Sequence, residues 1–368
     1  MELGLFFMPL HRPDKAWAQA LDEDRQAILA ADRAGYAEVW VGEHFTTKAE
    51  QIPAPLLFLS SLIHQTKLRL GTGVVNLGHR HPVVVAAEAA LFDQLSGGRL
   101  MLGVGPGGLS SDAELFGRPD QEQRFDAAME AIDMIKRLWA EEAPISLDGT
   151  YWQGALEEQF WPGLGVGQFP KPLQQPHPPL AMALVSPGGR TTETVAERSF
   201  IPISANFVPQ SSLLAQWEAY RRRRQELGLV VDRSIWRVCR SLLVTDSDAE
   251  ADELVSDPDG TFAFYFRYLG AVRGLHQPGF GRGRAAYLEH QFTAESAGGV
   301  GDVHAHGLVS RVGHAGRYAG ARLHPDRMAL RLEFFGGFGC DGDTGFAHGG
   351  LGGYANQHGA APVIVCLG

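Results

Sequence analysis

Three features are scarce in this 368-residue sequence, and each scarcity excludes a class of protein. Its three cysteines, Cys239, Cys340 and Cys366, lack the spacing of a disulfide framework or a zinc site, so we expect a reducing compartment, the cytoplasm. The formal net charge is -10 and no long block is rich in Lys and Arg, which predicts no nucleic-acid partner and no attachment to an anionic membrane. No apolar run reaches the roughly 20 residues of a membrane span, and acidic Glu2 is unlike a secretory signal.

Up to about residue 245, short apolar runs alternate with longer amphipathic stretches. Apolar residues recur every three or four positions in those stretches, which predicts helices. Fully apolar strands separated by amphipathic helices indicate a parallel sheet covered by helices, either an open doubly wound sheet or a closed barrel. Seven regularly spaced units in a chain of this length favour the α/β class and a (β/α)8 TIM barrel. The predicted strands are 3–8, 37–41, 68–74, 99–105, 180–185, 200–204 and 235–245.

Two segments depart from this alternation. Residues 146–178 are rich in Gly, Pro and aromatics, show neither period, and are interpreted as an insertion or long loop. Beyond about residue 270 the sequence becomes dense in Gly and His, so we divide the chain into a barrel, 1–270, and an atypical Gly/His-rich C-terminal segment, 271–368, that does not complete the barrel normally. That segment is a product of a shifted reading frame, a disordered region, or a genuine tail. Its apolar stretches, 328–335 and 361–367, are the candidates for the last barrel strand.

Titratable and glycine-rich residues follow three predicted strands at their carboxyl ends, where a parallel barrel carries its functional face. Glu43 and His44 follow the second strand, "GTGVVN" (71–76) the third and "GVGPGG" (103–108) the fourth. His44 is the leading catalytic candidate because histidine titrates near neutrality and donates or accepts a proton; the alternative is a rim histidine that only bonds backbone. Glu43 either orients His44 or pairs with an arginine. The glycines either admit a ligand close to the backbone or make tight turns.

A candidate phosphate site follows the strand at 180–185. Ser186, Gly188, Gly189, Arg190 and Thr191 combine glycines, hydroxyls and a cation at the start of a predicted helix, where backbone N–H groups bind anions. An ordinary N-cap is the alternative. A phosphate site here and a glycine-lined ring site at the third and fourth strands would together suit flavin mononucleotide (FMN).

Three further motifs receive ordinary explanations. "GVGPGG" fits a dinucleotide-binding pattern, but it follows the fourth strand, contains Pro106 and has no acidic residue about 20 positions later, so a Rossmann site is rejected. His79 and His81 have the spacing of metal ligands without a nearby third ligand, which favours a structured loop and no metal site. The four arginines at 221–224 are interpreted as a solvated helix face.

Several stretches of the sequence resemble the bacterial-luciferase-like flavin-dependent monooxygenases, especially the limonene-monooxygenase-like branch. The resemblance covers about residues 1–245 and is carried by "GLFFMPLHRP", "DRAGYAEVWVGEHF", "PAPLLFLSSL", "LRLGTGVVNLGHRHPVVVAAEAALFDQLSGGRLMLGVGPGG" and "ELFG". It implies a (β/α)8 enzyme that receives reduced FMN from a separate flavin reductase. In such an enzyme the reduced flavin reacts with O2 to form a C4a-peroxyflavin. This species inserts one oxygen atom into a small hydrophobic substrate. It also implies a homodimer.

Carried over by motif, the resemblance assigns roles to residues of this sequence. His44 is implied as the catalytic histidine, with Glu43 beside it, and a non-prolyl cis peptide bond is expected between Gly73 and Val74 beneath the flavin ring. The implied cofactor-binding residues are Thr72, Gly73, Val74, Gly105, Pro106, Gly107, Ser186 and Thr191. The alternatives are an F420 (deazaflavin)-dependent oxidoreductase of the same fold and a non-catalytic flavin-binding protein.

Aromatic residues near the predicted strands have two possible locations in the fold. Phe6, Phe7, Trp40, Phe45 and the insertion residues 151–169 either line an apolar substrate pocket or belong to the barrel core.

Overall fold

The computed structural model describes residues 2–8, 10–208, 210–244, 247–274, 309–312, 320–324, 329–333 and 363–367. The chain divides into two compact units. Unit 1 comprises Met1–Leu10, Ala16–Val39 and Leu184–Gly368, and unit 2 comprises His11–Lys15 and Trp40–Ala183. Strands β2 (Glu38–Val41) and β8 (Leu180–Leu184) each run from one unit into the other. Among the described residues, no helix combines the length and apolar character needed to cross a membrane.

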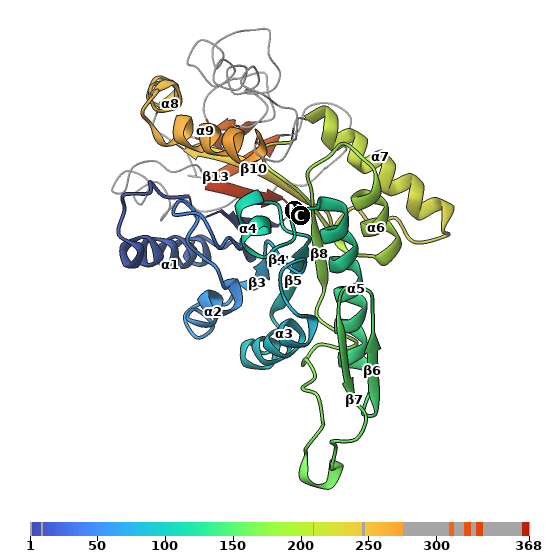
Figure 1. The fold of residues 1–368 in the computed structure, drawn as a ribbon. Coiled ribbons are helices and arrows are strands. Elements are labelled where there is room, and N and C mark those ends of the chain that lie inside the picture. The colour runs from blue at the N-terminus through green and yellow to red at the C-terminus, as the bar shows by residue number, and fades with distance from the viewer. Residues whose placement is uncertain are drawn as a thin grey trace. The chain divides into compact units, whose positions relative to one another are not determined.

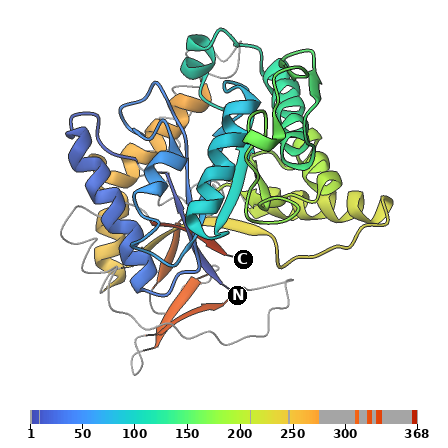
Figure 2. The same cartoon turned by 90° about the horizontal axis from the view of Figure 1, so that it is seen from below.

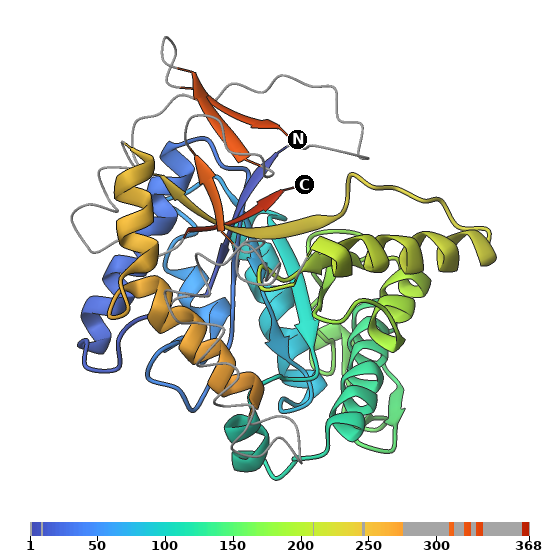
Figure 3. The same cartoon turned by 90° about the horizontal axis from the view of Figure 1, so that it is seen from above.

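Unit 1 contains strands and helices from both ends of the chain. Its strands pair in the order β9, β10, β14 and β1, and β11 adds to β10. Helices α6 and α7 pack side by side (Figure 3). The strands are β1 (Leu3–Phe7), β9 (Ile201–Ser204), β10 (Arg237–Val244), β11 (Val309–Val312) and β14 (Val363–Leu367). The helices are α1 (Trp17–Arg33), α6 (Arg190–Arg198), α7 (Gln210–Glu226), α8 (Asp248–Ser256) and α9 (Thr261–Gly274).

Strand β14 lies between β1 and β10 and runs antiparallel to both (Figure 2). The candidate stretch 361–367 therefore does supply a strand at this place, although parallel barrels close with a parallel strand. The other candidate, 328–335, is wrong, because β13 (Ala329–Glu333) pairs with β12 (Gly320–His324) in a separate two-stranded sheet. Most of the predicted segment 271–368, and with it the question of its origin, lies outside the described residues.

Unit 2 is built on parallel pairing. Strands β3 and β8 both pair with β5, and β4 extends the pairing of β3 along β5. All seven strands predicted from the sequence are present in the two units. The elements of unit 2 are β3 (Arg69–Thr72), β4 (Val75–Asn76), β5 (Leu100–Gly105), β6 (Ile145–Asp148), β7 (Gln153–Leu156), α2 (Pro55–Ser60), α3 (Pro82–Ser96), α4 (Ser110–Leu115) and α5 (Gln121–Ala140).

Glycines allow the strands of unit 2 to approach one another closely. A Cβ on Gly103 would lie 1.9 Å from the carbonyl oxygen of Thr72, and a Cβ on Gly71 would lie 2.4 Å from the ring of Trp40. Trp40 is fully buried against this surface and Phe6 is also buried, so both belong to the core. Phe45 and Phe7 are only partly buried. Any larger side chain at Gly103 would separate β3 from β5.

The segment interpreted as an insertion begins with a hairpin that the sequence interpretation missed. Strands β6 and β7 pair antiparallel beside α5 (Figure 1), and β6 alternates buried and exposed side chains. The carboxylate of Glu130 on α5 accepts hydrogen bonds from the backbone amides of Thr150, Tyr151 and Trp152 at the turn. This turn depends on a partner about twenty residues away, so the local pattern did not indicate it.

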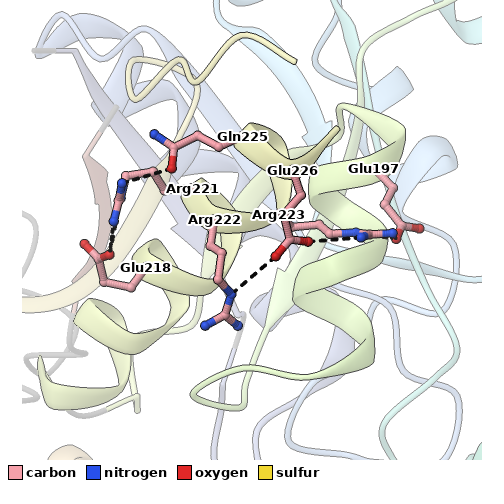
Figure 4. Close-up of polar contacts among 7 residues, drawn as sticks. All are labelled: Glu197, Glu218, Arg221, Arg222, Arg223, Gln225 and Glu226. Atoms are coloured by element: carbon pink, nitrogen blue, oxygen red, sulfur yellow. Dashed lines mark hydrogen bonds and ion pairs between the residues drawn. The ribbon is translucent and has the colours of Figure 1, made fainter. Parts of the chain in front are cut away.

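The arginine run on α7 contains two kinds of residue, and Figure 4 shows the first kind, Arg221, Arg222 and Arg223. Arg221, Arg222 and Arg223 form ion pairs at the surface with glutamates of α6 and α7, as predicted for a solvated face. Arg224 corrects that interpretation, because it is buried and donates to the carbonyl oxygens of Ala196 and Val230. Arg224 therefore satisfies backbone acceptors at the end of α6 and after α7.

Candidate functional site

His44 lies between two buried carboxylates of unit 2. Its Nε2 is 2.9 Å from Oε2 of Glu50, and its Nδ1 is 3.7 Å from Oδ2 of Asp112, while its own side chain stays 23% exposed. Burial lowers the pKa of His44, but the negative charges of Glu50 and Asp112 outweigh burial and raise the pKa to about 10. His44 is therefore an imidazolium at neutral pH and is suited to donate a proton. The sequence left two proton-transfer roles for His44, proton donor and proton acceptor, and this geometry favours the role of donor.

Asp112, in the first turn of α4, fixes the loop that carries His44. Its carboxylate accepts hydrogen bonds from the backbone amides of Phe45 (3.1 Å) and Thr46 (2.8 Å) and from the Thr46 hydroxyl (2.5 Å). Burial raises the pKa of Asp112, but His44 and these donors outweigh burial, so the pKa lies below its ordinary value. Asp112 is thus ionised at neutral pH. Sequence reasoning missed both Asp112 and Glu50.

Glu43 is buried and takes the second of its two predicted roles, pairing with an arginine. Its carboxylate accepts from Arg80 Nη1 (3.0 Å) and from the backbone amide of Asn76 (2.9 Å). The Asn76 side chain in turn donates to the carbonyl oxygen of Glu43 (3.0 Å). Burial raises the pKa of Glu43 to about 7 even though Asn76 and Arg80 lower it. Glu43 therefore links the end of β2 to the end of β4.

The predicted ring-binding segments lie at the ends of β3 and β5. The peptide bond between Gly73 and Val74 is cis, as predicted. Thr72 is fully buried and its hydroxyl donates to the carbonyl oxygen of Gly103 (2.7 Å). At Gly105, a Cβ would lie 2.9 Å from Cγ2 of Val74, so these two predicted residues face each other.

Gly107 and its neighbour His79 show why glycine stands in this turn. Gly107 has a φ of +90°, a conformation that favours glycine, and a Cβ there would lie 2.5 Å from Nε2 of His79. The buried His79 ring stacks on Phe116 with ring centroids 5.0 Å apart. Burial, together with the charges of Arg124 and Arg118, lowers the pKa of His79 to about 4. His79 is therefore neutral and packs beneath the turn, while Pro106 is partly exposed.

The second histidine of the HxH motif serves a different part of unit 2. Nδ1 of His81 accepts from the backbone amide of Val83 and caps α3. Within the described ranges, no group of three or more His, Cys, Asp or Glu side chains is placed to hold a metal ion.

Two arginines of unit 2 hold buried donors that sequence reasoning also missed. In the described part of the chain, Nη1 of Arg118 and Nε of Arg124 have no hydrogen-bond partner. Arg124 is buried, and its Nη1 donates to the carbonyl oxygens of Arg118 and Pro119. Buried polar groups are normally satisfied, and guanidinium groups suit phosphate and carboxylate, so these donors fit an anionic ligand group.

The predicted phosphate loop belongs to unit 1. Gly189 stands at the N-cap of α6 with a φ of +101°, and no side chain caps this helix. The N-cap residue is thus a glycine, and both interpretations of this loop, a phosphate site and an ordinary N-cap, stay predictions. Ser186 is exposed, Thr191 is partly buried in the first turn, and the carbonyl oxygen of Ser186 accepts from Nε2 of Gln216 (2.7 Å).

The parallel strand–helix units and the protonated His44 at the end of a strand define the class of protein. It is an α/β barrel with a proton donor at the carboxyl ends of its strands. The family model for luciferase-like monooxygenases matches residues 1–317. The 4-hydroxyprotoasukamycin monooxygenase of Streptomyces nodosus subsp. asukaensis is 33% identical over 282 residues, covering 73% of this chain and 72% of that protein. The limonene 1,2-monooxygenase of Rhodococcus erythropolis is 31% identical over 253 residues, covering 68% of this chain and 62% of that protein. This chain belongs to the luciferase-like monooxygenase family.

A solved structure supports the same conclusion about the fold. The oxygenating constituent of 3,6-diketocamphane monooxygenase of Pseudomonas putida, a type II Baeyer-Villiger monooxygenase in complex with FMN, matches with a TM-score of 0.68. Its sequence is 26% identical, and the match covers 80% of this chain and 79% of that chain. The predicted luciferase-like TIM barrel is confirmed, with the antiparallel β14 as its atypical end.

Proposed function

We propose that this protein is the oxygenating component of a flavin-dependent monooxygenase. It uses reduced FMN and O2 to insert one oxygen atom into a small hydrophobic substrate. The observation that supports the proposal is the state of His44, which lies just after β2 and which Glu50 and Asp112 keep protonated. A protonated imidazole that is held in place by its neighbours can act as a general acid. Neither a passive flavin carrier nor a structural protein needs such a group.

The residues of unit 2 fit FMN as the cofactor. The glycine-rich ends of β3 and β5 suit its flat ring. The chemistry that bound FMN would supply is the reaction of reduced flavin with O2. We further propose that Ser186 and Thr191 of unit 1 bind the phosphate, because the N-terminus of α6 has no side-chain cap.

The proposal includes a transient partner. A relative that is described as an oxygenating constituent binds FMN, and such a component needs a source of reduced flavin. We propose that a separate flavin reductase in the same compartment, the cytoplasm, supplies it. Reduced FMN would reach this protein by diffusion.

We also propose a homodimer through one face of α2 and α3. Leu57 on α2 and Val84, Leu91 and Leu95 on α3 are each at least half exposed, and the three on α3 are spaced seven and four residues apart on one helix face. Replacing Leu91 by Lys is expected to convert the dimer to monomers in sedimentation velocity. The exposed Leu164, which lies outside these helices, serves as a matched Leu→Lys control. A wild-type monomer would contradict the proposal.

Cofactor choice is tested by equilibrium binding of FMN and F420, followed by fluorescence, to wild type and to Thr191→Val. We expect FMN to bind and F420 to bind far more weakly. Thr191→Val keeps the size of the side chain but removes its hydroxyl donor, so FMN affinity should fall about tenfold, the size of one hydrogen bond to a charged group. Preferential binding of F420 would contradict the monooxygenase proposal and favour a deazaflavin-dependent oxidoreductase.

A further inference from the structure

A buried chain of hydrogen bonds in unit 1 ends on the loop that follows β8. Nε1 of Trp236 donates to Oγ of Ser204 (3.0 Å), and Oγ of Ser204 donates to Oε1 of Gln216 (2.6 Å). Nε2 of Gln216 then donates to the carbonyl oxygen of Ser186 (2.7 Å). Gln216 and Ser204 are fully buried and Trp236 nearly so, while Ser186 itself is exposed. The chain thus connects the interior of unit 1 to an exposed turn.

The chemistry of the three side chains gives this chain one direction. An indole N–H can only donate, so the Ser204 oxygen must accept from Trp236 and direct its own proton to Gln216. The oxygen of the Gln216 amide therefore faces Ser204, and its nitrogen faces Ser186. A buried amide with both ends bonded has a single favoured orientation. Gln216 consequently holds the Ser186 carbonyl group at a fixed place.

The turn beyond Ser186 leads into α6 and contacts α7. Gly189 has a positive φ and α6 lacks a capping side chain, as described above. A Cβ on Gly188 would lie 3.8 Å from Cβ of Ala219, so the turn rests on the same helix, α7, that carries Gln216. The position of the first amides of α6 therefore depends on contacts with α7.

We propose that Gln216 is a positioning residue for phosphate binding. It acts through the Ser186 carbonyl group and makes no contact of its own with the cofactor. The inference rests on the proposed assignment of the FMN phosphate to Ser186 and Thr191. Loss of Gln216 should therefore weaken the part of cofactor binding that depends on phosphate and leave the part that depends on the ring.

The test compares the affinities of FMN and riboflavin, which differ only by the phosphate. In Gln216→Leu we expect FMN affinity to fall about tenfold or more and riboflavin affinity to stay the same. The ratio of FMN affinity to riboflavin affinity therefore falls by the same factor. Gln225→Leu is the matched control, because Gln225 lies on the exposed side of the same helix and bonds Arg221 (Figure 4). Its ratio should equal that of wild type.

A second variant keeps the test decisive if Gln216→Leu does not fold. Ser204→Ala retains Gln216 but removes the proton that orients its amide, so it should lower the same ratio. Equal affinity of wild type for FMN and riboflavin would overturn the phosphate assignment. A wild-type preference for FMN that survives in Gln216→Leu and Ser204→Ala would overturn only the role of Gln216. An equal loss of both affinities would also overturn that role, since it indicates general damage.

Discussion

Replacing His44 by Gln is expected to lower the rate of substrate oxygenation by about 100- to 10,000-fold, the range that a general acid contributes. Glutamine retains hydrogen-bonding groups near Glu50 and Asp112 but carries neither the charge nor the transferable proton of the imidazolium. The measurement is the rate of product formation at saturating reduced FMN with a panel of small hydrophobic ketones and alkenes. FMN binding to the variant, measured separately, shows that the site remains formed.

His81→Gln is the matched control for this variant. His81 lies in the same unit and caps α3, outside the group formed by His44 and the two carboxylates. Its oxygenation rate should match wild type. A His44→Gln enzyme with an undiminished rate would remove His44 from the chemistry and favour a role that is limited to loop structure.

Replacing Glu50 by Gln is expected to lower the pKa of His44 by about one to three units, the effect of a close opposite charge. In wild type the pKa is about 10 because Glu50 and Asp112 outweigh burial, and without Glu50 the opposing effect of burial gains weight. The pKa is measured by NMR of labelled imidazole groups. Glu141→Gln, which removes a surface carboxylate paired with Arg137 in the same unit, should leave the His44 pKa unchanged.

The same titration has a consequence for stability. The folded pKa of His44 lies above its ordinary value of 6.5, so the charged histidine contributes its full stabilisation below pH 6.5. That contribution is lost as the pH rises toward about 10. The loss should shrink in Glu50→Gln, where folded and ordinary pKa values are closer. A wild-type pKa near 6.5, or an unchanged pKa in Glu50→Gln, would contradict the charge assigned to His44.

Local periodicity was enough to predict the strands and to place His44, but not its partners. Each barrel strand is a short apolar run whose signal is contained in its own residues, and His44 directly follows one of them. Glu50 lies in a loop, and Asp112 is more than sixty residues away on α4, which the sequence interpretation did not include. Only the packed chain brings these three side chains together.

The C-terminal segment shows a second limit of local patterns. Two apolar stretches of similar strength competed for the last strand, and neither indicates a direction or a partner by itself. Pairing with β1 and β10 selects the stretch that contains β14, and it runs antiparallel. The glycines at the strand ends were equally ambiguous. Gly103 proved to allow close packing on Thr72, which depends on how neighbouring strands are registered.

The proposed function is tested most directly by the fate of isotopically labelled dioxygen. The full chain is supplied with reduced FMN by a flavin reductase, and the hydrophobic substrate panel is analysed by mass spectrometry for label. We expect a product that contains one labelled oxygen atom, whose formation requires FMN and is abolished or strongly reduced in His44→Gln. Products without label, or a substrate oxidised by hydride transfer with F420 and no O2, would rule out the proposed monooxygenase function.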